Sequence, residues 1–378
     1  MNIPFNKPFL TGKEAHYLYQ SVYSGKISGN GIFTKKCQQF FEEKYGFKKT
    51  LLTTSCTDAL EMAAILADIQ ADDEIIIPSY TFVSSALAFV RQVAKIIFAD
   101  SYEDQPNLDV STLESLITSR TKAIVPVHYA GVACDMDAIM KLAEKYNLIV
   151  IEDAAQAVDS FYKNRPLGGI GHLSAFSFHE TKNIMAGEGG MLVINDDRYL
   201  NRAEIIWEKG TNRAEFFRGE VNKYGWVDTG SSFLPSDILA AFLYAQLENL
   251  DIIQSKRREI WDNYHNAFLN DPKMARVGLP IIPDYATNNS HMYYLVCADI
   301  EERSALIEFL KQKGILAVFH YLSLHKSPYY SSRYTGNELK NSDHFSDCLV
   351  RLPMFFELTS EEQTYIINAV KSFYQKRN

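Results

Sequence analysis

Two residues near the middle of the chain have the types and setting that amine chemistry requires. The apolar run 148–151 ends on an acidic pair that includes Asp153, which is typical of a buried parallel strand that presents an acid at its carboxyl end. Lys182 follows in an aromatic-rich segment, 174–183. Pyridoxal phosphate needs a lysine for a Schiff base and an acid beside its pyridine nitrogen. Lys182 and Asp153 are candidates for these two roles.

Simpler explanations exist for each of these signals. An Asp after a strand is commonly a helix N-cap, and a Lys in a loop is usually solvated. The small hydroxyl-rich stretch 55–58 precedes a helical segment, so it predicts either an ordinary N-cap or a phosphate site at the free amides of a helix start. From the residues alone, both interpretations of the stretch stay open.

The elements that must position these residues alternate between short apolar runs and amphipathic helical stretches. This alternation predicts an α/β domain with a mostly parallel sheet covered on both faces. Ligand-binding residues should then gather at the carboxyl ends of strands, where Asp153 and His128 fall. The expected strands are 50–54, 74–77, 95–100, 123–127, 148–152 and 191–195, and the expected helices are 33–45, 59–67 and 136–146.

The second half of the chain changes character twice. Segment 207–233 is basic and aromatic with little periodicity, which favours a long functional loop over a solvated connection. A long helix is expected over 236–264, and a smaller α+β domain after it. Its expected elements are a strand over 292–298, a helix over 304–313, a strand over 317–321 and a helix over 360–374. We therefore expect a large domain, 1–246, that begins with an N-terminal arm, and a small domain, 247–378.

Composition excludes several classes of protein. The chain has 378 residues, 47% of them hydrophobic, which is enough for more than one core. A net charge of -8 argues against nucleic-acid binding, so an anionic ligand must be held by local groups. Five scattered cysteines without a C-x-x-C pattern predict reduced thiols rather than a disulfide or metal framework. No run reaches membrane-spanning length, and we expect a soluble cytoplasmic protein.

Five motifs, in order along the chain, resemble those of the DegT/DnrJ/EryC1/StrS sugar aminotransferases. The resemblance covers essentially the whole chain and implies a fold-type-I, pyridoxal phosphate-dependent transferase. The motifs are Cys56-Thr57-Asp58-Ala59-Leu60, Pro78-Ser79-Tyr80-Thr81-Phe82, Glu152-Asp153-Ala154-Ala155-Gln156, the run Ser177 to Asn183, and Gly187-Glu188-Gly189-Gly190.

The resemblance implies a role for each matching residue. Lys182 would form the Schiff base and then carry the proton, and Asp153 would pair with the pyridinium nitrogen. Gln156 would hydrogen-bond the ring hydroxyl, and Phe82 would stack on the ring. The phosphate would be held by the amides of Thr57 and Asp58 and by the hydroxyl of Ser177.

One departure from the family pattern affects the substrate side. Many members carry Gly-x-Asn-x-Arg where this chain has the segment 230–234, so Ser232 replaces the asparagine that reaches a partner subunit's phosphate, and a leucine replaces the arginine. The amino-donor carboxylate then needs another cation. Arg213 and Arg218 are the candidates, and Lys223 is a further candidate for binding the nucleotide diphosphate. His325 is expected to contact the sugar.

Four further segments resemble more closely those members that act on dTDP-4-dehydro-6-deoxy-D-glucose in enterobacterial common-antigen or O-antigen biosynthesis. These segments are 126–134, 208–213, 216–219 and 318–321. The resemblance implies a homodimer with shared active sites that moves an amino group from L-glutamate to C4 of this sugar. Alternatives are the other C4 epimer, amination at C3, or a UDP-sugar. A C3 dehydratase usually has histidine in place of the lysine, and a pyridoxal phosphate sensor would carry a DNA-binding segment.

Overall fold

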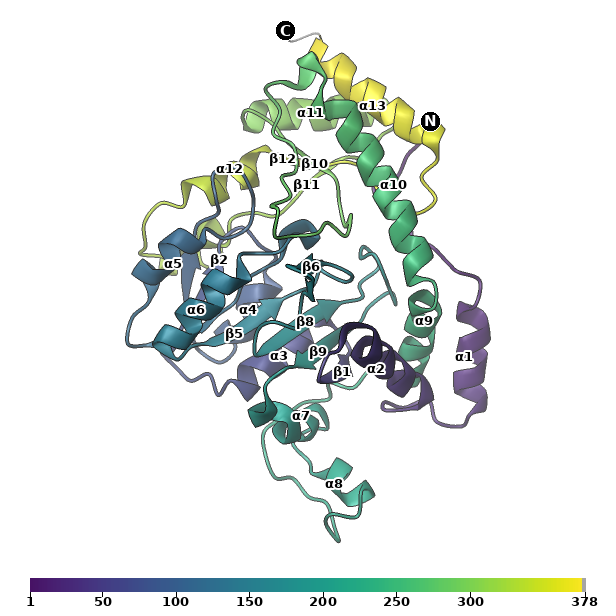
Figure 1. Cartoon of the computed structure of the whole chain (residues 1–378), viewed down its shortest axis with the longest axis vertical. Coiled ribbons are helices and arrows are strands. Elements are labelled where there is room, and N and C mark those ends of the chain that lie inside the picture. Colours follow the sequence, from purple (N-terminus) through teal and green to yellow (C-terminus); the bar gives the residue numbers. More distant parts are fainter. Residues whose placement is uncertain (376–378) are drawn as a thin grey trace.

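A seven-stranded sheet forms the centre of the computed structural model, which describes residues 1–375 (Figure 1). The strand order is β1-β9-β8-β5-β4-β2-β3, and β9 runs antiparallel to both of its neighbours while the other neighbouring pairs are parallel. The predicted α/β class with a mostly parallel sheet is confirmed. The strands are β1 (Lys49–Thr53), β2 (Glu74–Pro78), β3 (Lys95–Ala99), β4 (Thr121–Ile124), β5 (Ile149–Asp153), β8 (Leu173–Ser177) and β9 (Gly190–Ile194).

Helices cover both faces of this sheet because its strands are apolar on both sides. In β2, Ile75 and Ile77 pack with the helices of one face, and Ile76 packs with those of the other. The first face carries α3 (Cys56–Leu66), α4 (Ser84–Val90) and α7 (Leu200–Trp207). The second carries α2 (Ile32–Tyr45), α5 (Val110–Leu116), α6 (Met136–Tyr146) and α9 (Asp237–Leu247), with α1 (Glu14–Tyr23) packed on α9.

Local capping explains where the helices near the cavity described below begin. The hydroxyl of Ser55 accepts a hydrogen bond from the amide of Asp58 at 3.1 Å, so Ser55 is the N-cap of α3. Helix α6 begins after the N-cap Asp135 and ends at Asn147, which adopts the left-handed conformation with φ of 53°. The predicted helix over 136–146 is thereby confirmed.

A smaller layer of helices lies against a three-stranded sheet formed late in the chain. Its core also contains Ile3, so the N-terminal arm packs on it. The predicted boundary between 246 and 247 falls at the end of α9 and stays a prediction. The elements are α10 (Leu250–Leu269), β10 (Tyr294–Val296), α11 (Ile300–Gln312), β11 (Val318–Phe319), α12 (Lys340–Cys348), β12 (Leu349–Arg351) and α13 (Ser360–Gln375), and two short strands, β6 (Phe161–Tyr162) and β7 (Arg165–Pro166), form a separate hairpin.

The prediction of one helix over 236–264 was wrong, because the structure divides it into α9 and α10. The side-chain amide of Asn249 donates to the carbonyl of Ala245 at 2.9 Å, and its backbone amide donates to Gln246 rather than to Ala245. Such a local side-chain hydrogen bond competes with the helical pattern. The break lets α9 stay on the large sheet while α10 runs to the smaller layer (Figure 1).

Four strands of the described chain were not predicted: the two of the β6-β7 hairpin, and β8 and β12. The segment with Lys182 begins with β8, which was interpreted only as an aromatic-rich stretch, and β12 is the central strand of the small sheet, in the order β10-β12-β11. β12 is short and carries Arg351 within an apolar run, which hides its strand character. Across residues 1–375, no helix is both long and apolar enough to cross a membrane.

Candidate active site

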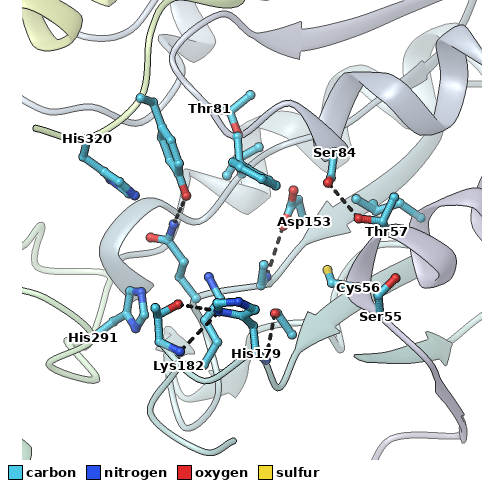
Figure 2. Close-up of a pocket in the computed structure, with 18 of the residues that line it drawn as sticks. Ser55, Cys56, Thr57, Thr81, Ser84, Asp153, His179, Lys182, His291 and His320 are labelled. Atoms are coloured by element: carbon cyan, nitrogen blue, oxygen red, sulfur yellow. Dashed lines mark hydrogen bonds between the residues drawn. The ribbon is translucent and has the colours of Figure 1, made fainter. Parts of the chain in front are cut away.

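A cavity of about 300 Å³ lies where the strands of the large sheet end, and it is closed by residues from the small layer. Lys182, Asp153, Gln156, Ser177 and Phe82 all line it, so the structure brings together residues that are far apart in sequence. Figure 2 shows Lys182 and Asp153 in this cavity. This is the place where ligands bind in open α/β sheets.

Lys182 lies in the loop between β8 and β9, and its amide donates to the carbonyl of His179 at 2.9 Å. Desolvation is the main cause that lowers the pKa of its amine to about 8, and the positive charge of Arg351 lowers it further. An amine with this pKa is partly neutral near pH 7 and can act as a nucleophile and a base.

Asp153 is the last residue of β5, and its carboxylate is fixed by two donors. The hydroxyl of Ser85 donates to Oδ2 at 2.6 Å, and the amide of Ala155 donates to Oδ1 at 3.1 Å. The hydroxyl of Ser85 also lies 2.9 Å from that of Thr81, which lines the cavity, so the three side chains form one hydrogen-bonded chain. These contacts hold the carboxylate in one orientation at the cavity wall.

The start of α3 lines the cavity with backbone amides and hydroxyl groups, which are suited to binding a phosphate and are called the phosphate cradle below. The amides of Cys56 and Thr57 are the first two of the helix and have no intrahelical acceptor, whereas the amide of Asp58, which the resemblance implied as a ligand, is used by the Ser55 cap. Gly190 faces this turn so closely that a Cβ would lie 2.3 Å from the carbonyl carbon of Ser55. Thr57 also bonds to the hydroxyl of Ser84 at 2.7 Å.

Gln156 and Phe82 lie at the part of the wall where the two layers meet. The side chain of Gln156 accepts from the amide of Ala130 at 2.6 Å and donates to the hydroxyl of Tyr321 at 3.0 Å. Phe82 is 54% exposed, and its ring centre lies 5.8 Å from that of Tyr321. An aromatic ring this exposed at a cavity can stack on a planar ligand.

Four lining residues to which the sequence interpretation gave no role come from the last quarter of the chain: His291, His320, Tyr321 and Arg351. Asn183 lies 2.8 Å from Nδ1 of His291, and the hydroxyl of Tyr129 lies 2.7 Å from Nδ1 of His320. Burial lowers the pKa of both histidines well below the ordinary value, so both are neutral at pH 7. The sequence did contain a signal for Arg351, because this charged residue interrupts an apolar run, which is typical of a buried functional group.

The substrate-side candidates of segment 207–233 lie outside this cavity. Arg213 begins the short helix α8 (Arg213–Phe217), which projects away from the body of the protein (Figure 1). Arg218 pairs with Glu204 and Glu220, and the remaining candidates, Lys223 and Ser232, are exposed. Within a single chain, none of these residues lines the cavity.

Two histidines that the sequence analysis singled out lie outside the cavity in the described chain. His325 is buried outside the cavity, where its Nδ1 lies 2.7 Å from the Ser79 hydroxyl and its Nε2 lies 3.6 Å from Asp343. His128 follows a strand as expected, yet it is fully buried against Glu152 at 2.9 Å and does not line the cavity. For both histidines, the contacts indicate a structural role.

The chemistry of the lining residues fits pyridoxal phosphate. An amine with a lowered pKa, a fixed carboxylate, an exposed aromatic ring and a helix start with free amides all line one cavity. Fold and site together therefore define a pyridoxal phosphate-dependent enzyme of the fold-type-I class.

Comparisons with known proteins identify the family. The model of the DegT/DnrJ/EryC1/StrS aminotransferase family matches residues 9–371, and the chain belongs to this family. A GDP-perosamine synthase from Escherichia coli O157:H7 is 33% identical over 376 residues, which cover 99% of each chain.

Solved structures of sugar aminotransferases match the fold of this chain. Spr1654 from Streptococcus pneumoniae, named a sugar aminotransferase, has PLP-form and PMP-form structures that match at a TM-score of 0.90 and 26% identity, covering 100% of this chain and 98–99% of theirs. Helicobacter pylori PseC, an aminotransferase involved in the biosynthesis of pseudoaminic acid, matches with the same TM-score and identity over 100% of both chains. The protein is a pyridoxal phosphate-dependent sugar aminotransferase.

The lowered pKa of Lys182 predicts the pH dependence of cofactor loading. Only the neutral amine attacks the aldehyde, so below pH 8 the rate at which the apoenzyme forms its covalent link should fall about tenfold per pH unit, and above pH 8 it should level off. At pH 7 about a tenth of the Lys182 amine is neutral, roughly 300 times the fraction of an ordinary lysine. Absorbance during reconstitution measures this rate. A midpoint above pH 10, as for a solvent-exposed lysine, would contradict the prediction.

Proposed function

We propose that the enzyme transfers an amino group from L-glutamate to the C4 ketone of dTDP-4-dehydro-6-deoxy-D-glucose, giving dTDP-4-amino-4,6-dideoxy-D-galactose and 2-oxoglutarate. One observation carries the proposal. Segments 126–134 and 318–321, on which the substrate-level resemblance depends, contribute Val127, His320 and Tyr321 to the cavity wall. Specificity for a sugar is set by such lining side chains. The free thiols of the cysteines support a cytoplasmic location.

The residues of the cavity would divide the work of this reaction. Pyridoxal phosphate supplies a ring that withdraws electrons from the carbon bearing the transferred nitrogen. Lys182 would hold the cofactor and then move the proton at that carbon with its Nζ atom. Asp153 would keep the ring nitrogen charged, and Gln156 and Phe82 would orient the ring. The amides of Cys56 and Thr57 would bind the phosphate, with the hydroxyl of Ser177 as a third donor.

The proposed substrate is tested by offering the enzyme L-glutamate with keto-sugars linked to dTDP, UDP and GDP. We expect the dTDP-linked 4-keto sugar to have a kcat/KM at least about tenfold above the others, which corresponds to about 1.4 kcal/mol in transition-state binding. NMR coupling constants of the product should show an axial C4 amine, as in galactose. An equatorial amine, a C3 amine or faster turnover of a UDP- or GDP-sugar would contradict the proposed substrate and product.

We also propose that the enzyme is a homodimer in which each active site uses residues of both subunits. Supporting this, the loop 207–233 carries highly exposed aromatic side chains, among them Phe217 at 70% and Trp226 at 85%. Exposed aromatic residues on a projecting loop are typical of a surface that a partner covers. Arg213, Arg218 and Ser232 would then reach the substrate or cofactor phosphates of the other subunit.

Mixing two inactive variants tests this arrangement. One chain carries Lys182→Ala, and the other carries Arg218→Ala with Ser232→Ala. Since a mixed dimer would have one intact site, random association should restore about a quarter of the wild-type activity. Mass spectrometry of differently tagged chains verifies that mixed dimers form. No recovery in verified mixed dimers would show that each subunit builds its site alone.

A further inference from the structure

Arg351 is a buried cation that forms no ion pair with a carboxylate among residues 1–375. The residue is only 9% exposed, and its Nε atom has no hydrogen-bond partner among residues 1–375. Burial lowers the pKa of its guanidinium, and the neighbouring tyrosines Tyr129, Tyr321 and Tyr80 partly offset this lowering. Leaving a buried charge unpaired is costly, so proteins normally pair it or use it.

The other buried arginine of the small layer shows the contrast. Arg257 donates to the carbonyl oxygens of Ser290 at 3.1 Å and His291 at 2.6 Å, so its guanidinium has a structural role. Arg351 has no such acceptors in the described chain, although Phe5 of the N-terminal arm covers its guanidinium with a ring centre 4.7 Å away. An aromatic face partly stabilises a cation and leaves its N–H edge free.

Strand geometry directs the side chain of Arg351 toward the cavity. Side chains alternate along β12, so Val350 enters the core of the small layer. Leu349 and Arg351 project from the opposite face, where Leu349 packs with Tyr80 and Tyr129 of the large layer. Arg351 therefore lines the cavity that also holds Lys182.

The charge balance of the cavity leaves one group suited to hold a substrate anion. Lys182 and Arg351 are the two lysine or arginine residues that line it within the described chain, and Lys182 is used for the covalent chemistry. His291 and His320 are neutral at pH 7, as argued above. The phosphate cradle at α3 relies on backbone amides instead. An amino acid that enters this cavity must place its carboxylate against a cation.

We propose that Arg351 binds a carboxylate of the amino donor through the N–H edge of its guanidinium. A guanidinium fork matches a carboxylate in geometry and charge, and it stays protonated even where burial lowers its pKa. The inference rests on the proposed function only for the identity of the donor, because every amino acid donor carries a carboxylate. Arg351 would then be the cation that the donor carboxylate needs, since segment 230–234 lacks the arginine found in many family members.

The test compares Arg351→Gln with a matched control in the holoenzyme. The control is Arg303→Gln, since Arg303 also stacks on an aromatic ring of the small layer, that of Phe319, and does not line the cavity. For Arg351→Gln we expect the apparent Kd for L-glutamate in the first half-reaction to rise at least about 30-fold, and the KM for the keto-sugar to stay within about threefold. Arg351→Lys should recover part of the loss.

A direct binding measurement separates this role from catalysis. Glutarate, a dicarboxylate without an amine, should bind the wild-type holoenzyme in calorimetry and bind Arg351→Gln at least about tenfold more weakly. Unchanged glutamate and glutarate affinity, or a loss confined to the keto-sugar, would overturn the inference. If the wild type reacts with another amino acid in place of glutamate, the proposed donor fails, and the same comparison with that amino acid and its deaminated analogue tests Arg351.

A stability measurement distinguishes a ligand-binding arginine from a structural one. If Arg351 is held for a ligand, Arg351→Met removes a desolvated charge and fills the same space, so the melting temperature of the unliganded enzyme should stay equal or rise. Addition of glutarate should raise the melting temperature of the wild type and leave that of the Met variant unchanged. A lower melting temperature for Arg351→Met would indicate a structural role and overturn the inference.

Discussion

Lys182→Ala is expected to reduce turnover of the cofactor-loaded enzyme by at least about three orders of magnitude, or roughly 4 kcal/mol in the barrier. The change removes both the covalent anchor and the proton carrier. No other lysine lines the cavity in the described part of the chain, so nothing can replace its amine. Single-turnover kinetics with L-glutamate measure the loss, and absorbance spectra should show cofactor that is bound without its lysine link.

A surface lysine provides the control. Lys163 forms an exposed pair with Asp137 at 2.8 Å, and Lys163→Ala should change turnover by less than about twofold. The phosphate cradle at α3 is untouched in Lys182→Ala, so the variant should retain cofactor through gel filtration. Turnover within tenfold of wild type would show that Lys182 is not the essential amine.

The central residues of this site were predictable because their signals are local. Asp153 ends an apolar strand, and parallel strands bring their carboxyl ends to one edge of the sheet, which places Asp153 beside the segment with Lys182. The helix start at Ser55 is also encoded within a few residues. These features depend on hydrophobic pattern and caps, which short stretches of sequence determine.

The far wall of the cavity was not predictable in this way. His291, His320 and Arg351 reach the site only because the small layer packs on the large one, and that packing depends on contacts between distant segments. The same reason explains His325, whose sequence position suggested a sugar contact but whose partner Ser79 lies far away along the chain. Pattern analysis assigns such residues to elements and does not show which cavity they face.

Asp153→Asn is expected to lower kcat by at least about two orders of magnitude, with little change in stability. Asparagine has the same shape, so its Oδ1 can still accept from the amide of Ala155, which lies 3.1 Å from the present carboxylate. Its Nδ2 would then donate to the hydroxyl oxygen of Ser85, which now lies 2.6 Å from the other carboxylate oxygen. Asparagine carries no charge, so it cannot keep the ring nitrogen of the cofactor protonated. The half-reaction with L-glutamate, followed by absorbance, measures the loss of rate.

The surrounding hydrogen bonds supply the comparison that separates charge from position. Ser85→Ala removes the donor to Oδ2 and keeps the carboxylate charge, so its effect on kcat should stay within about tenfold. Because Asp153→Asn removes the charge and keeps the position, it should be the more damaging change of the two. A reversed order, or an Asp153→Asn enzyme within about threefold of wild type, would mean that orientation rather than charge is what Asp153 contributes to catalysis.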